Sequence, residues 1–108
     1  MRLRRRDAPF ADLVERQLAL FQEDESELLN EATEAEAAWI RAGRDTAEES
    51  YGDFQLVVDA IADGLLALRD TYARTLDEDA AAAYRDAFAA GVASRFRRYA
   101  SVVADLEP

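Results

Sequence analysis

Residues 51–72 of the chain read YGDFQLVVDAIADGLLALRDTY. Apolar side chains recur in this stretch at alternating intervals of three and four residues. Their positions are Tyr51, Phe54, Val58, Ile61, Leu65, Leu68 and Tyr72. Because an α-helix has 3.6 residues per turn, these side chains form one stripe along a single helix face. Such a stripe is typical of helices that pack against one another in bundles and coiled coils.

The boundaries of this helix, and of the one that follows, are indicated by capping residues. Thr46 with Glu49 three residues later has the pattern of a capping box, which predicts a helix over about 46–75. Asp77 is a good N-cap residue and is followed by two acids, which predicts a further helix over about 78–105. Its inward positions are Tyr84, Phe88, Val92, Phe96, Tyr99, Val102, Val103 and Leu106.

The N-terminal third of the chain predicts one long helix over about 8–42. Pro9 suits its first turn, and Gly43 suits its end. The acidic run 23–27 interrupts the apolar stripe of this helix at Glu25. Asp24 and Glu27 in that run have the spacing of a new helix start, so a break near 23–26, which gives four helices, is the alternative.

Connections this short make neighbouring helices antiparallel, so the sequence predicts an all-α antiparallel bundle in a single domain of residues 1–108. Residues 1–7 are expected to be a frayed basic terminus. Folding the helices back on one another pairs apolar residues at every level and brings Gly64 near the level of Gly91, where two helices can approach closely. The predicted packing positions are Leu28, Phe54, Val58, Ile61, Gly64, Leu65, Leu68, Tyr84, Phe88, Gly91, Val92 and Tyr99.

The composition excludes several classes of chemistry. The chain has no Cys and no His, and all 13 of its cationic residues are Arg. Disulfides, histidine catalysis, thiol nucleophiles and Schiff-base lysines are therefore excluded. The net charge of −10 makes nucleic acid and anionic membrane unfavourable partners. With no long apolar run, the expected location is the cytoplasm.

Carboxylates at helical spacing are the remaining candidates for chemistry. Glu31 and Glu34 form one pair, and Glu49 and Asp53 form another on the next helix. Carboxylates three or four residues apart project side by side, and Mg²⁺ prefers such oxygen ligands.

In this region the chain resembles the MazG-like all-α nucleoside triphosphate pyrophosphohydrolases. These enzymes bind Mg²⁺ through a Glu-x-x-Glu pair and a following Glu-x-x-Asp pair. The resemblance covers about residues 27–60 and implies Mg²⁺ ligands at Glu31, Glu34 and Asp53. Ser50 stands where the family has its third carboxylate, which leaves Glu49 as the substitute ligand.

The favoured functional prediction is not enzymatic. The long apolar stripes indicate surplus apolar surface, which predicts self-association, a homodimer for example, or docking of a protein partner, with no cofactor. Nucleic acid and membrane are not expected as partners. A cluster of arginines, Arg95, Arg97 and Arg98, is the candidate binding site for an anion or an acidic partner.

Overall fold

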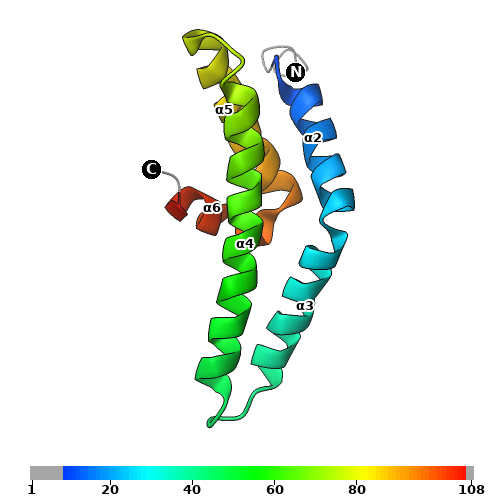
Figure 1. The fold of residues 1–108 in the computed structure, drawn as a ribbon, viewed down its shortest axis with the longest axis vertical. Helices are drawn as coiled ribbons and strands as arrows, with labels where there is room; N and C mark the ends of the chain where they lie inside the picture. Colours follow the sequence, from blue (N-terminus) through cyan, green and yellow to red (C-terminus); the bar gives the residue numbers. More distant parts are fainter. Residues whose placement is uncertain (1–8, 107–108) are drawn as a thin grey trace.

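In the computed structural model, which describes residues 9–106, all regular structure is helical (Figure 1). The predicted all-α bundle is therefore confirmed, with more breaks than expected. Residues 1–7, the predicted basic terminus, lie outside the described residues. The helices are α2 (Ala11–Asp24), α3 (Ser26–Arg41), α4 (Ala47–Ala73), α5 (Glu78–Arg95), the 3₁₀ turn η1 (Arg97–Tyr99) and α6 (Ala100–Leu106).

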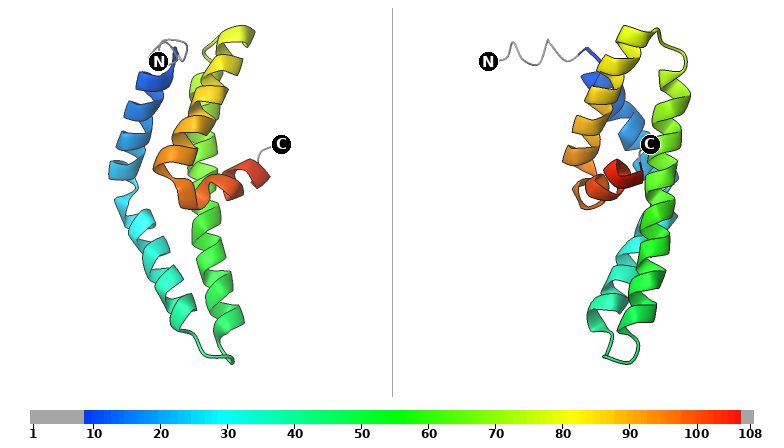
Figure 2. Two further views of the ribbon diagram at one scale, coloured as in Figure 1. Left: turned by 180° about the vertical axis from the view of Figure 1, so that it is seen from behind. Right: turned by 90° about the vertical axis from the view of Figure 1, so that its left-hand side faces the viewer.

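The long helix α4 is the axis on which the other helices are arranged. It has 27 residues and lies within the predicted range of about 46–75, and α3 runs antiparallel to it over its N-terminal half (Figure 1). α5 folds back beside the C-terminal half of α4, and α2 packs chiefly against α5 (Figure 2). The molecule is elongated, with extents of 51 × 29 × 22 Å.

The predicted N-terminal helix is broken at Glu25, so the four-helix alternative is the correct one at this point. Glu25 has φ −106° and ψ 29°, outside the helical region, and its side chain is exposed. The break lets consecutive segments of one apolar stripe face different partners, because α2 packs on α5 while α3 packs on α4. Four acids within residues 23–27 also weaken a continuous helix by mutual repulsion.

The predicted continuous helix over 78–105 is wrong after Arg95. Phe96 has φ −119° and ψ 47°, and the chain then turns through η1 so that α6 crosses α4 (Figure 2). The ring of Phe96 meets that of Phe21 edge to face at 5.8 Å. The turn buries Phe96 against α2. It also buries Tyr99 and Val103 in the core. The sequence pattern predicted that the helix over 78–105 packs along the whole length of the helix over 46–75. Because α5 ends at Arg95, it does not pack against the N-terminal half of α4.

Gly64 and Gly91 both face α2, which corrects the expectation that they approach each other. A Cβ at Gly91 would lie 2.7 Å from Val14 Cγ1 and 2.9 Å from Leu18 Cδ1. A Cβ at Gly64 would lie 3.1 Å from the ring of Phe21 and within 4 Å of no other side chain. Gly91 therefore allows α2 to lie close to α5, and Gly64 allows α2 to lie close to α4.

The core is centred on Tyr84, whose side chain is fully buried. Three rings surround it, with centroid separations of 5.6 Å to Phe10, 4.8 Å to Tyr72 and 5.9 Å to Phe88. The predicted packing residues Val58, Ile61, Leu65, Phe88, Val92 and Tyr99 are buried in the same core, and Leu28, Phe54 and Leu68 pack against it while partly exposed.

One of the two predicted helix caps forms. Asp77 Oδ1 accepts a hydrogen bond of 2.8 Å from the backbone N–H of Ala80, as expected for the start of α5. The capping box at Thr46 is wrong, because Thr46 is the N-cap of α4 but its side chain caps no backbone group.

We expect Asp77→Ala to lower the free energy of unfolding by about 1 kcal/mol, because it removes this cap and an acid at the positive end of the helix dipole. Thr46→Ala is the matched control and should cost less than half as much. Urea denaturation followed by circular dichroism measures both. Equal losses at the two positions would contradict the prediction.

Candidate functional site

Among residues 9–106, the end of the molecule that carries the α3–α4 loop is two helices thick. α4 has 27 residues and α5 has 18, so α5 is shorter by about 13 Å at 1.5 Å per residue. Figures 1 and 2 show α3 and the N-terminal half of α4 extending beyond η1 and α6. We call this part, α3 together with residues 47–58, the arm.

One face of α4 is covered near the middle of the molecule and open on the arm. Tyr51, Ala62 and Ala73 are each eleven residues, or about three turns, apart and so share this face. Ala62 is 0% exposed and Ala73 is 2% exposed, whereas Tyr51 is 44% exposed. α6 and η1 cross α4 near its middle, and the N-terminal part of α4, which includes Tyr51, extends beyond them (Figure 2). The arm therefore presents a helix face that has no third helix over it among the described residues.

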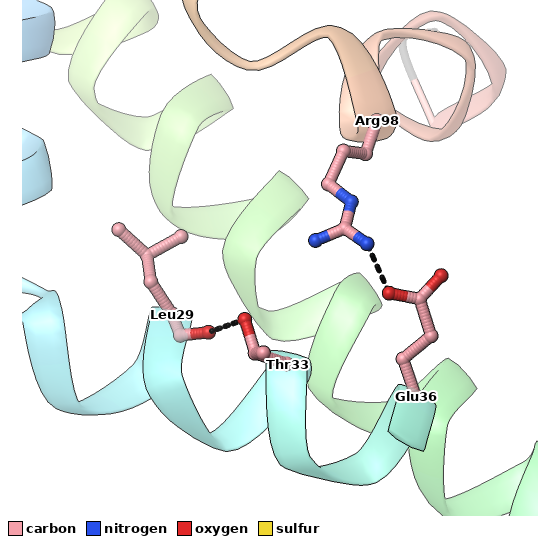
Figure 3. A network of polar contacts seen from close by, with 4 residues as sticks. All are labelled: Leu29, Thr33, Glu36 and Arg98. Carbon is pink, nitrogen blue, oxygen red and sulfur yellow. Dashed lines mark hydrogen bonds and ion pairs between the residues drawn. The ribbon is translucent and has the colours of Figure 1, made fainter. Parts of the chain in front are cut away.

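α3 contributes the other half of this face. Leu29, Glu36 and Ile40 lie seven and four residues apart, on one side of α3. Arg98 of η1 reaches Glu36 and forms an ion pair with its Oε1 (Figure 3), which shows that this side of α3 faces η1. One turn beyond Glu36, Ile40 is 72% exposed. We call the surface formed by Ile40, Tyr51 and the edge of Trp39, bounded above by the Arg98–Glu36 pair, the open face.

The base of the open face is held by an aromatic cluster. The ring of Trp39 lies 4.8 Å from Tyr51 and stacks on Phe54 at 5.8 Å with an interplanar angle of 17°. Trp39 is nevertheless 36% exposed. Three rings joined across α3 and α4 hold the two helices of the arm in a defined arrangement, which favours a preformed surface.

The four predicted metal ligands lie on the opposite side of the arm. Glu31 is nine residues before Ile40, and Asp53 is two residues after Tyr51, so both point away from the open face. Glu31, Glu34, Glu49 and Asp53 are all exposed. Within residues 9–106, no three acidic side chains are grouped closely enough to hold one metal ion. The geometry thus gives the arm an acidic back.

The three predicted anion-binding arginines do not converge. Arg95 donates a hydrogen bond of 2.8 Å to Gln22 Oε1 on α2, and Arg98 pairs with Glu36 on α3. Arg97 lies between them and is exposed. Two of these side chains thus tie the turn after α5 to α2 and α3.

Two hollows lie between helices of the main body. One, of about 460 Å³, lies between α2 and α5 over Val14, Leu18 and Gly91, with Glu15 and Arg95 among its lining residues. The other, of about 350 Å³, lies among α4, α5 and α6 and includes the buried Arg69, whose Nη2 is 2.8 Å from Asp70 Oδ1. Both are lined largely by alanine and aliphatic side chains.

The sequence pattern did not indicate Ile40, and it placed Tyr51 in the apolar stripe that packs against other helices. The exposed position of both residues depends on where α5 ends, and no glycine or proline near Phe96 indicates that point. A signal for the open face was nonetheless present, because the chain carries more large apolar side chains than three thin helices can bury.

Comparison of the chain with protein-family models, curated proteins and solved structures finds no match. Within residues 9–106, no helix combines the length and the apolar content needed to cross a membrane.

Proposed function

We propose that this protein acts through protein–protein association, either with a second copy of itself or with another protein, and that the open face of the arm is the contact surface. We place this role in the cytoplasm. The single observation that carries the proposal is the change in burial along one face of α4, which is covered at Ala62 and open at Tyr51.

The exposed side chains on this face are of the kind that stabilise interfaces. Ile40, Tyr51 and Trp39 provide one large aliphatic and two aromatic groups within one surface, and interface centres are enriched in aromatic residues. An amphipathic helix that packs across the two helices of the arm would cover these three side chains, as happens in helix-in-groove recognition. The resulting arrangement is a three- or four-helix bundle completed by the partner.

Site-specific photo-crosslinking tests this proposal. A benzophenone side chain at Ile40 should give a discrete crosslinked product when the protein is produced in its native host. Leu56 provides a matched control, since it is 70% exposed against 72% for Ile40 but lies about 140° round α4 from Tyr51. The same group at Leu56 should give little or no product.

The mass of the product identifies the kind of association. A product of about twice 12.0 kDa indicates self-association, and any other discrete mass indicates a different protein. No product at Ile40, or equal products at Ile40 and Leu56, would contradict the proposal.

A further inference from the structure

Resting on the proposed function, we infer that the occupant of the open face is an amphipathic helix of another protein, which carries Arg or Lys along the edge that faces α4. Two observations support it, namely the exposed apolar side chains of the open face and the distribution of charge around them.

The arm is strongly acidic. Residues 26–58 contain eight acidic residues and two arginines, a net charge of −6 within a chain of −10. A second copy of this chain would bring the same excess of negative charge to the interface, whereas a basic helix would neutralise it. Charge complementarity therefore favours a different protein over a second copy.

The charges that border the open face are arranged unevenly. On α4, Glu48 and Asp59 lie within about 80° of Tyr51 round the helix, so both border the face along one edge. On α3, the bordering charge is Arg41, and Glu36 is already paired with Arg98. A bound helix therefore meets carboxylates along its α4 edge only, which is where its cationic residues belong.

The length of the open face limits the length of the partner helix. Beyond the Arg98–Glu36 pair α3 has five more residues, or about 8 Å at 1.5 Å per residue, and residues 47–58 of α4 extend over about 18 Å. The partner segment is accordingly short, about two to three turns, with an apolar stripe that covers Ile40 and Tyr51. Binding of this kind is reversible, since a small surface provides few large apolar side chains for the partner to contact.

Trp39 supplies the measurement, because it is the single tryptophan of the chain and lies at the edge of the open face. The probe is a synthetic amphipathic helical peptide without Trp or Tyr, which carries a leucine stripe and Arg on one edge. We expect it to shift the emission of Trp39 to shorter wavelength in a saturable way. A peptide with Glu in place of Arg should have an affinity at least roughly tenfold lower. A scrambled peptide of unchanged charge should lose affinity by the same factor.

Two pairs of substitutions separate local recognition from general attraction. E48K with D59K reverses both charges that border the face on α4 and should weaken binding roughly five- to tenfold. E31K with E34K makes the same change of charge on the back of the arm and should alter the affinity less than about twofold. Equal effects of the two pairs, or equal binding of the scrambled peptide, would overturn the inference.

The two tests fail in different ways. If Ile40 forms a crosslink but the basic peptide does not shift Trp39, this inference is wrong and the proposed function stands. If the crosslinked product is a second copy of the chain, the inference is again wrong. If Ile40 forms no crosslink, both proposals are wrong.

Discussion

Replacing Tyr84 by Ala should lower the free energy of unfolding by about 3–5 kcal/mol, the range for removing a buried aromatic side chain. Tyr84 is fully buried and meets the rings of Phe10, Tyr72 and Phe88, so its loss leaves a cavity lined from α4, α5 and the start of α2. Small domains are stable by about 5–15 kcal/mol, so this single change removes a large share of the total. Urea denaturation followed by circular dichroism measures the loss, and a cost below about 1 kcal/mol would contradict it.

Tyr84→Phe separates the ring from its hydroxyl. The hydroxyl donates a hydrogen bond of 2.8 Å to Gln17 Oε1 on α2, and its removal should cost about 0.5–1.5 kcal/mol. Burial raises the pKa of the Tyr84 hydroxyl above its ordinary value of 10.0. The folded chain therefore favours the neutral form, and its contribution to stability is complete below pH 10 and is lost as the pH rises towards the folded-state pKa. Between about pH 9 and pH 11, the Phe variant should lose less stability than the unsubstituted chain.

The second large effect comes from a pair of glycines in helices. Gly91→Ala should destabilise the protein, whereas Gly52→Ala should stabilise it by about 0.5–1 kcal/mol. Both changes gain helix propensity equally, by about 1 kcal/mol. At Gly52 a Cβ meets nothing within 4 Å, but at Gly91 it would lie 2.7 Å from Val14 Cγ1 and 2.9 Å from Leu18 Cδ1. The difference between the two variants thus measures the cost of crowding.

We expect this difference to be about 1–3 kcal/mol, the usual cost of an added methyl group in a packed interior. Val14 and Leu18 are each only 1% exposed, so a Cβ at Gly91 would displace two buried side chains. Thermal unfolding of the two variants side by side measures the difference. If the two glycines respond alike, α2 does not pack on α5 as closely as the structure shows.

The open face follows from two turns that differ in how far the sequence predicts them. The break at Glu25 was predicted as an alternative, because the run of acids interrupts the apolar stripe there. The turn at Phe96 was not predicted, because Tyr99, Val102 and Val103 continue the apolar spacing of α5. Helical periodicity is equally compatible with a straight helix and with two helices that bury the same residues against different partners. The exposure of Ile40 and Tyr51 depends on that difference.

The individual helices were determined by the sequence alone. The apolar stripe from Tyr51 to Tyr72 predicts a helix over 46–75, and α4 extends over Ala47–Ala73. The cap at Asp77 was likewise predicted, because hydrogen bonding between residues three apart in the chain is a local property. The placement of the carboxylates at positions 31 and 34 on one side of a helix was predicted for the same reason, because it depends only on residues three apart in the chain.

Only the tertiary structure decided which helix each apolar face covers. Gly64 and Gly91 both meet α2, and α6 covers α4 at its middle while it leaves the arm open. The physical reason is that burial of apolar area is non-directional, so one stripe gains nearly the same free energy from any apolar partner within reach. The choice between partners is made by side-chain fit and chain length over the whole molecule, which no local pattern contains.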